Sequence, residues 1–520
     1  MKCQGWLASR LYVHLSYNSG NNFSNVIVST QGSKPLSIRA RFAPSPTGYL
    51  HIGGLRTALY CYLFARSQGG HLVLRIEDTD RTRFVADAEN DIVQALQWCG
   101  LEVDEGPQQG GGYGPYRQSE RQSLYVKYAE SLVASGHAYY AFDSPGSIAA
   151  LRKTNAAYGI GTRLQMDNSL TQSKEVLRQR LDAKEEYVIR LRVPENEMVQ
   201  FHDLIKGAVK VSSESIDDQV LIKSDGMPTY HLANVVDDHH MAISHVIRGD
   251  EWIPSTPKHI LLYQMLGWQP PMMAHLPLIL SPTGGKLSKR SAERQGIPIN
   301  VRDYRARGFE PQAVVNFLAF LGWNPGSEDE VFGLKELEQV FRLERVGSAP
   351  AQFDLNKLNW FNGQHLRRLD IEALANRVLP FLGAHGIQAQ DHRYLREVCF
   401  LVRDRLEHAE DLATRFSYCF VDPDKFDPVG VKKRWKADAA DLVRGYADRL
   451  EAVKSFDEEA LETELRALAE RRGVGAGRII HPVRIAVSGT TAGPSLFALL
   501  RVLGQDTCVR RLRSAVRILG

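Results

Sequence analysis

The chain has 520 residues, of which 43% are apolar, and this length predicts about three to four domains that can each bury a core. Its 64 basic and 60 acidic residues give a net charge of +4, a surplus too small to indicate nucleic-acid binding by itself. The six cysteines show no CxxC or other metal-ligand spacing, which disfavours both a disulfide-stapled protein and a structural zinc site.

Residues 1–36 contain three basic residues and no acidic one, and polar residues interrupt their apolar stretches. This pattern disfavours a secretory signal peptide. The acid-poor composition is compatible with an organellar transit peptide, but the segment has too few arginines to favour one. We expect a disordered extension, for which a start codon placed too far upstream is one source. The longest apolar stretches, such as 313–323, are far shorter than a membrane span. A soluble, cytoplasmic protein is expected, with a mitochondrial or other organellar matrix as the alternative.

From Ser37 onward, the apolar residues follow regular periods. A short strand is predicted over 38–43, and after a Pro/Gly loop the helical spacing of apolar residues continues to Gly69-Gly70. A second strand over 71–76 and an amphipathic helix over 87–98 follow. This alternation predicts a βαβα unit of a parallel sheet, which is one half of a Rossmann-like α/β fold.

A stretch rich in Gly, 108–116, interrupts this alternation, and the mixed pattern up to about residue 215 predicts an inserted domain. The parallel-sheet pattern resumes with strands predicted over 219–223, 245–248 and 275–280, and with a helix over 258–266. Two separated segments are therefore expected to form one nucleotide-binding fold.

After about residue 300, predicted strands largely vanish and helical patterns with basic clusters follow, as in 431–436 and 508–517. Such clusters could contact phosphates, although solvated helix faces are the favoured explanation when the clusters are taken alone. The predicted organisation is an extension (1–36), a first Rossmann half (37–110), an inserted domain (111–215), a second Rossmann half (216–280), a loop and connecting region (281–370) and an all-helical region (371–520).

The segment Arg41-Phe-Ala-Pro-Ser-Pro-Thr-Gly-Tyr-Leu-His-Ile-Gly-Gly54 joins the first predicted strand to the first helix. In a parallel sheet this place binds ligands, because the helix start offers unpaired N–H groups to phosphate. Its prolines stiffen the loop, His51 can donate to a phosphate oxygen, and Gly53 and Gly54 leave room for a flat base. Without further evidence, the prolines and glycines of such a loop would only form a turn, and the histidine would only cap the helix.

Two further segments carry candidate chemistry. Lys286-Leu-Ser-Lys-Arg290 follows a Gly-containing loop, and its two lysines can reach one triphosphate when the loop closes. Arg75-Ile-Glu-Asp-Thr-Asp80 places acids after the second strand, where they face the expected cleft. The simpler alternatives are a solvated turn for the first segment and a helix-capping cluster for the second.

These segments together resemble the class I aminoacyl-tRNA synthetases in the form typical of the glutamyl branch. The first matches the signature named for His-Ile-Gly-His, with Gly54 in place of the final histidine, and the second matches Lys-Met-Ser-Lys-Ser. The stretches 229–238 and 246–252 resemble the same branch. The resemblance covers residues 38 to about 370 with specific motifs, and beyond that it rests on a helical pattern of the right length.

The resemblance implies a Rossmann-like catalytic domain with an inserted acceptor-binding domain, followed by an all-α anticodon-binding region. It implies a monomer that uses ATP with Mg²⁺ to join L-glutamate to tRNA(Glu), with tRNA(Gln) as a further open candidate. Glutamate activation should require bound tRNA. Relatives often carry zinc in the inserted domain, but no cysteine lies between Cys99 and Cys399 here, so no structural zinc is expected.

By resemblance, Arg41 pairs with the side-chain carboxylate of glutamate and Glu77 holds its amino group. An arginine fork suits a carboxylate better than an amide, which favours glutamate over glutamine. Without the resemblance, Arg248 would be a surface ion pair and Tyr230 a core residue. The expected site residues are Arg41, Ala43, Ser45, Glu77, Tyr230, Asn234 and Arg248 for glutamate, Thr47, Gly53, Gly54, Glu251 (ribose), Leu278 and Ile279 (adenine), Lys286 and Lys289 for ATP, and His51, Lys286 and Lys289 for catalysis.

The stretch Tyr113 to Arg121 recurs in the same family near the acceptor end of tRNA, and Arg117 and Arg121 are expected to make at most phosphate contacts. Three alternatives stay open. A glutaminyl synthetase usually has a β-barrel anticodon region, and a glutamyl transferase that modifies queuosine in tRNA ends before an anticodon domain. A non-enzymatic tRNA-binding relative would not need His51 and Lys286, which are both present.

Overall fold

The computed structural model describes residues 37–80, 82–153, 157–389 and 391–520. The extension predicted for residues 1–36 lies outside the described residues. Side chains of Arg152 and Lys289 are likewise outside the description. Within the described part of the chain, none of the helices has the length and apolar character needed to cross a membrane.

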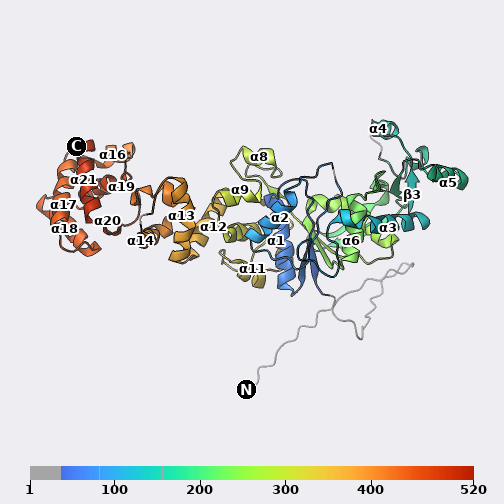
Figure 1. Ribbon diagram of the computed structural model, residues 1–520, viewed down its shortest axis with the longest axis horizontal. Coiled ribbons are helices and arrows are strands. Elements are labelled where there is room, and N and C mark those ends of the chain that lie inside the picture. Colours follow the sequence, from blue (N-terminus) through green and yellow to red (C-terminus); the bar gives the residue numbers. More distant parts are fainter. Residues whose placement is uncertain (1–36, 81, 154–156, 390) are drawn as a thin grey trace, which may run out of the picture. The chain divides into compact units, whose positions relative to one another are not determined.

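A six-stranded sheet is the centre of the amino-terminal part of the described body (Figure 1). All neighbouring strands run parallel except the last pair, and β1 pairs with both β2 and β8. The sheet therefore joins the two separated segments, as predicted. The strands, in spatial order, are β2 (His71–Leu74), β1 (Arg39–Phe42), β8 (His245–Gly249), β9 (Met272–Leu276), β5 (Met198–Asp203) and β6 (Gly207–Ser212).

Helices cover both faces of this sheet, because alternate strand residues point to opposite sides. Leu72 and Leu74 of β2 belong to one buried core, and Val73 between them belongs to another. The first core includes residues of α1 (Ile52–Ser67), α2 (Ala88–Trp98) and α10 (Pro311–Phe320), and the second includes residues of α3 (Gln122–Ala134), α6 (Tyr230–His240) and α7 (Thr256–Met265).

Two strand predictions were wrong in their pairing. The strand expected over 219–223 forms as β7 (Val220–Ile222), but it pairs antiparallel with β4 in a separate three-stranded sheet. The single strand expected over 275–280 is broken at Pro277, which has no N–H for the ladder, into β9 and the two-residue β10 (Ile279–Leu280). Hydrophobic periodicity predicts that a segment forms a strand, but it does not predict with which strand it pairs.

The strands β5 and β6 lie in the range predicted for the inserted domain, yet β5 pairs parallel with β9 of the central sheet. The three-stranded sheet of this range has a buried polar centre, in which Asp218 contacts Arg163 at 3.1 Å and accepts a hydrogen bond from Tyr139 at 2.7 Å. Its elements are β3 (Ala138–Ala141), β4 (Val188–Leu191) and β7, with α4 (Pro145–Lys153) and α5 (Lys174–Asp182) nearby in sequence.

The region after β9 contains short elements around the Lys286 segment and helices that join the first core. β10 pairs parallel with β11, so the Lys286 loop leaves from a small two-stranded sheet. The elements are α8 (Lys289–Glu293), α9 (Val301–Ala306), α11 (Leu334–Val340), β11 (Ala351–Gln352) and α12 (Leu355–Arg368).

The described residues from 371 onward form helices and turns without any strand, as predicted, and their core is separate from the two cores of the sheet. The helices are α13 (Ile371–Ala384), α14 (His392–Val402), α15 (Asp411–Thr414), α16 (Pro428–Arg434), α17 (Ala439–Ala452), α18 (Glu458–Arg471), α19 (Gly477–Ser488), α20 (Leu496–Leu503) and α21 (Gln505–Leu519).

One member of the basic cluster in α21 does not face solvent. Arg511 is buried and donates to the backbone oxygens of Tyr418, Val421 and Val487 at 2.7 to 3.1 Å, and it pairs with Asp422 at 2.8 Å. Both interpretations of the 508–517 cluster, phosphate contact and solvated face, are therefore wrong for Arg511. It is a structural cation that satisfies backbone acceptors between helices.

Replacement Arg511→Met should destabilise the helical region by about 3–5 kcal/mol, because three backbone carbonyls, two of them in buried bonds, and a carboxylate lose their donor. Hydrogen exchange followed by mass spectrometry should show faster exchange in α19 and α21. The matched control is Arg513→Met, because Arg513 lies on an exposed face of the same helix and pairs with Asp448 and Glu451. Equal exchange rates in the two variants would contradict the structural role.

Candidate active site

The candidate site residues gather where the parallel strands end. The signature loop follows β1, the acidic segment follows β2, and Glu251 follows β8. Backbone bonds hold the first two loops side by side, since the N–H of Glu77 donates to the oxygen of Pro44 at 3.0 Å. In open α/β sheets, ligands bind at this edge. The loops that carry the predicted site residues therefore lie together at this edge of the sheet.

His51 caps the first turn of α1. Its backbone is extended, and its Nδ1 accepts a hydrogen bond from the N–H of Gly54 at 3.1 Å. Because Nδ1 accepts, the proton of the neutral ring lies on Nε2, which is the nitrogen able to donate. A segment missed by sequence reasoning supports this turn: Asn300 bridges His51 antiparallel, and Ile52 donates to Ile299 at 2.8 Å.

The glycines that follow have separate steric reasons. A β-carbon on Gly53 would lie 3.1 Å from both Nδ1 and Cε1 of His51, so a side chain there would press on the imidazole. A β-carbon on Gly54 would meet the Cδ1 of Leu50 at 2.8 Å, which is the mobile end of a side chain. Gly53 thus keeps the ring of His51 in place, in addition to the room for a base that the sequence suggested.

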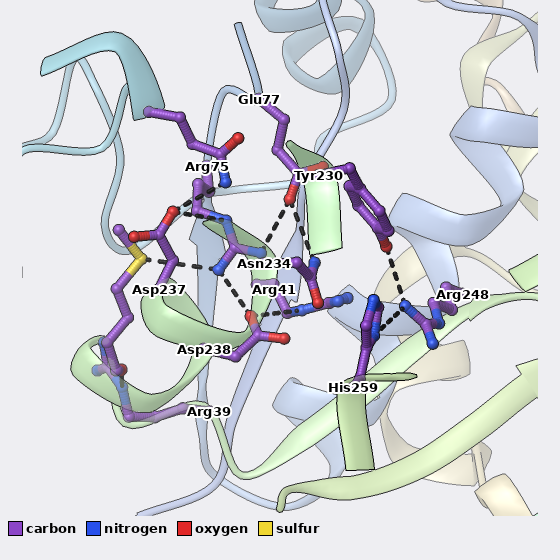
Figure 2. A network of polar contacts seen from close by, with 12 residues as sticks. Arg39, Arg41, Arg75, Glu77, Tyr230, Asn234, Asp237, Asp238, Arg248 and His259 are labelled. Atoms are coloured by element: carbon purple, nitrogen blue, oxygen red, sulfur yellow. Dashed lines mark hydrogen bonds and ion pairs between the residues drawn. The ribbon is translucent and has the colours of Figure 1, made fainter. Parts of the chain in front are cut away.

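A buried ionic cluster lies beside the signature loop (Figure 2). The guanidinium of Arg75 is fully buried and contacts Glu77 at 2.9 Å and Asp238 at 2.6 Å. Asp238 also accepts from Nε of Arg41 at 3.0 Å. The amide of Asn234 lies between these groups: Figure 2 draws its nitrogen toward Glu77 at 3.3 Å, and with the amide turned over the nitrogen donates to Asp238 at 3.3 Å and the oxygen accepts from Arg75 at 3.1 Å. Arg41, Glu77 and Asn234, predicted separately, belong to one network.

The charges in this network shift the pKa values of its acids in opposite directions. Burial raises the pKa of Glu77, and Arg75 and Arg41 only partly oppose this. Burial also acts to raise the pKa of Asp238, but Arg41 and Arg75 outweigh it and the net pKa is lowered. Asp238 is therefore the firm counterion of the two arginines, and Glu77 is the acid whose charge is less well compensated.

Asp237, the residue before Asp238, accepts hydrogen bonds from a different set of side chains. It accepts from Arg121 at 2.7 Å, from Gln118 at 2.8 Å and from Tyr125 at 2.8 Å, and all of these groups are buried. Arg121 is thus part of the scaffold, and the phosphate contact expected for it is wrong. Arg117 lies nearer to the surface and pairs with Glu89 at 2.8 Å.

Arg248 is a buried cation whose hydrogen-bond acceptors are all neutral. Its Nε donates to Nε2 of His275 at 3.1 Å, and its terminal nitrogens donate to the hydroxyls of Tyr230 and Thr256, both at 2.9 Å. Among the described residues, no carboxylate lies within ion-pair distance of it. Figure 2 shows Arg248 with Tyr230 and His259, apart from the Asp238 cluster. The surface ion pair considered from sequence is wrong, because the side chain is only 5% exposed.

The residues expected to bind the nucleotide follow the ends of β1, β8 and β9 in the chain. Thr47 and Glu251 are exposed, Leu278 is half-buried, and Ile279 is buried in β10. The carboxylate of Glu251 folds back over Gly249, where a β-carbon would collide with it. Of the remaining glutamate residues, Ala43 is half-buried and Ser45 is exposed.

The Lys286 segment forms a loop held by polar contacts. Lys286 is exposed and bridges Leu280 antiparallel, and Lys289 is the first residue of α8. The amide nitrogen of Gln295 ties this loop by donating to Ser281 at 2.7 Å and to Thr283 at 3.1 Å. Among the described residues, no contact joins Lys286 to the buried ionic cluster.

Arg56 is a further residue that sequence reasoning missed. It is 3% exposed, its Nε and one terminal nitrogen have no hydrogen-bond partner within the described residues, and its guanidinium lies over the ring of Tyr60 at 5.4 Å. Burial lowers its pKa, an effect that Tyr60 only partly offsets. The available signal was an arginine inside the buried run from Leu55 to Ala65 of α1.

Replacement Asp238→Asn should destabilise the fold by about 3–5 kcal/mol at neutral pH, because two buried arginines lose their shared counterion. The folded-state pKa of Asp238 is depressed, so its contribution is present above the unfolded pKa of about 3.9 and is lost as pH falls through the lower folded value. Thermal unfolding from pH 8 to pH 3 should show a gap between variant and native protein that closes only at the acidic end.

The control for that experiment is Asp225→Asn, since Asp225 is exposed and faces Lys223 at 3.5 Å. It should melt with the native protein at every pH. A gap for Asp238→Asn that widens toward low pH would contradict the ionised state assigned to Asp238.

Within the described residues, no group of three or more His, Cys, Asp or Glu side chains is placed to hold a metal ion.

Known proteins share both parts of this chain. Residues 37–360 match the catalytic domain of class I tRNA synthetases (E and Q), and residues 373–516 match an anticodon binding domain.

Individual relatives match over nearly the whole length. The chain is 44% identical over 498 residues to the glutamate–tRNA ligase of Christiangramia forsetii, covering 92% of this chain and 98% of that protein. It is 45% identical over 504 residues to that of Amoebophilus asiaticus, covering 93% and 98%. The crystal structure of a glutamate tRNA ligase from Elizabethkingia meningosepticum in complex with its amino acid superposes with a TM-score of 0.88 at 38% identity, covering 93% of this chain and 100% of that one. The chain therefore belongs to the class I tRNA synthetases of the glutamate and glutamine family.

Proposed function

We propose that this protein is a glutamate–tRNA ligase that uses ATP to attach L-glutamate to tRNA for protein synthesis. In the first step, the α-carboxylate of glutamate attacks the α-phosphorus of ATP, and pyrophosphate leaves. In the second step, the 2′-hydroxyl of the terminal adenosine of tRNA attacks the glutamyl carbonyl, and AMP leaves. Neither step needs a nucleophile from the protein, so the chain acts by positioning and by charge stabilisation.

The observation that carries the glutamate specificity is the buried Arg248 without an acidic partner. An uncompensated buried cation is costly, and a ligand carboxylate would compensate it. The terminal nitrogens of Arg41 also have no carboxylate partner among the described residues, since Asp238 contacts only its Nε. Arg41 and Arg248 would therefore hold the side-chain carboxylate of glutamate, together with the hydroxyl of Tyr230.

Glu77 is the group proposed for the amino end of the substrate. Burial raises the pKa of Glu77 and so disfavours its charged form, which a bound ammonium would stabilise. Asn234 lies between Glu77 and Asp238, and its amide nitrogen can donate to one of these acids at a time. Glutamine would present a neutral amide to two guanidinium groups, so it should bind more weakly.

The other half of the site is proposed for ATP, which enters as its Mg²⁺ complex. Nε2 of His51 would donate to the phosphates at the start of α1, and Lys286 and Lys289 would approach them from the closing loop. Glu251 would bind the ribose, and Leu278 and Ile279 would cover the adenine. Thr47, Gly53 and Gly54 would line the phosphates.

The helical region would bind the anticodon part of tRNA. A queuosine-modifying transferase would have no counterpart of residues 373–516, and a glutaminyl synthetase would need a pocket for a neutral amide. Choice between tRNA(Glu) and tRNA(Gln), the monomeric state and the cytoplasmic location remain predictions.

The proposed function is tested by charging of tRNA. Purified protein should attach radiolabelled glutamate, but not glutamine, to tRNA(Glu) transcripts with ATP, and pyrophosphate exchange should need added tRNA. Lys286→Ala should reduce charging by about two orders of magnitude, which excludes a contaminating host enzyme as the source. Lys335→Ala, an exposed lysine of α11, is the matched control. Glutamine charging, or no charging at all, would refute the proposal, and a second transcript of tRNA(Gln) would define the tRNA range.

Replacement Gly53→Ala should lower the rate of adenylate formation by about tenfold, since the new methyl group displaces the His51 ring by a few tenths of an ångström. The KM for glutamate should stay close to the native value, because the methyl group is remote from Arg248. Gly48→Ala is the control in the same loop, where a β-carbon meets no atom within 4 Å. Equal rates for both variants would show that the position of His51 does not limit the reaction.

A further inference from the structure

Three neighbouring strands place Asp203, His275 and Arg248 in one buried line. Arg248 of β8 is the register partner of His275 of β9, and Asp203 of β5 is the register partner of Met273, also on β9. Oδ2 of Asp203 lies 2.6 Å from Nδ1 of His275, and Nε2 of His275 accepts from Nε of Arg248 at 3.1 Å. Asp203 is 1% exposed and His275 is fully buried.

The contact with Asp203 decides which nitrogen of His275 carries the proton. The pKa of Asp203 is lowered because its bonds to His275 and to backbone N–H groups outweigh burial, so it is a carboxylate that accepts the Nδ1–H. Burial lowers the pKa of His275 against the opposing effect of Asp203, which keeps the ring neutral. The Nε2 lone pair therefore faces Arg248. In the other tautomer, two N–H groups would oppose each other at 3.1 Å.

This arrangement holds one edge of the guanidinium of Arg248. Nε is fixed by His275, and the terminal nitrogen on the same edge donates to Thr256, whose hydroxyl also lies 3.2 Å from Nε2 of His275. The other terminal nitrogen reaches the hydroxyl of Tyr230, on the side of the proposed glutamate pocket. The scaffold thus fixes the Nε edge, and on the other edge it supplies only neutral acceptors, the hydroxyl of Tyr230 at 2.9 Å and Nδ1 of His259 at 3.4 Å.

We propose that Asp203 and His275 are positioning residues that aim Arg248 at the carboxylate of the amino-acid substrate, with Asp203 fixing the tautomer of His275. The proposal rests on the function proposed above. Neither residue touches the substrate, so both act on glutamate affinity through Arg248 and leave the ATP half of the site unaffected.

A pair of amide substitutions separates the two contacts of His275. Asparagine places its amide near Nδ1, so His275→Asn can still donate to Asp203 but offers nothing to Arg248. Glutamine reaches the position of Nε2, so His275→Gln can accept from Arg248. We expect His275→Asn to raise the KM for glutamate about tenfold or more, and His275→Gln to recover most of it. The KM for ATP should stay within about twofold of the native value in both.

Asp203→Asn gives an independent reading, because an amide at this place no longer forces the proton of His275 onto Nδ1. It should also raise the KM for glutamate selectively. His365→Asn is the matched control, since His365 is a buried histidine that contacts Asn316 and lies outside the site. Glutamate protection against thermal unfolding, measured on all four variants and the native protein, supplies a readout that needs no turnover.

The outcomes are distinct for the two proposals. If native protein neither charges tRNA nor is stabilised by glutamate, the proposed function fails. If native protein is active and His275→Asn keeps the native KM for glutamate, the positioning role fails. A parallel rise of the KM for glutamate and for ATP in both His275 variants would also overturn it, because it would show a general loss of structure. Folding is checked by circular dichroism, and KM values are compared at a temperature where each variant is folded.

Discussion

The site depends on how the buried arginines at the ends of the parallel strands are compensated. Removing a guanidinium from water costs several kcal/mol, so each buried arginine needs acceptors that the fold supplies or a ligand brings. The charge of Arg75 is balanced by the fold, since Glu77 and Asp238 lie within 3 Å of its terminal nitrogens, while its buried Nε has no hydrogen-bond partner among the described residues. Its ion pairs join the end of β2 to α6, and this link brings loops that are about 160 residues apart in sequence to one place.

Arg41 and Arg248 differ from Arg75 in what remains unsatisfied. Asp238 contacts only Nε of Arg41. Among the described residues, all hydrogen-bond acceptors of Arg248 are neutral. The fold thus buries two guanidinium groups near the ends of β1 and β8 and supplies fewer than two counterions for them. A dicarboxylic amino acid matches this deficit better than a neutral one, because it adds the missing charge where burial makes the charge most effective.

Much of this arrangement could be predicted from the sequence. The strand and helix periods identified both halves of the sheet. The motifs predicted Arg41, Glu77, Tyr230, Asn234 and Arg248 as glutamate-binding residues, and the structure joins Arg41, Glu77 and Asn234 in one polar network. Long-range pairing could not be read in the same way: β7 and β5 show ordinary strand patterns, but their partners depend on packing between distant segments. The burial of Arg511 and Arg121 could not be predicted either. The sequence does not distinguish an arginine that faces solvent in a basic cluster from one that donates to buried backbone oxygens.

The position of β5 changes how the inserted segment relates to the catalytic sheet. An insertion that returned to the sheet only after residue 215 would contribute nothing beneath the amino-acid pocket. Instead, β5 reaches β9 within that segment and brings Asp203 beside His275. The carboxylate also accepts from the backbone N–H groups of Ile205 and Lys206, which begin the turn toward β6. A shift of the β5–β6 hairpin would therefore move Asp203, and through His275 it would change the hydrogen bonding of Arg248. The segment between the two Rossmann halves is thus linked to Arg248, the proposed glutamate ligand, by hydrogen bonds through Asp203 and His275.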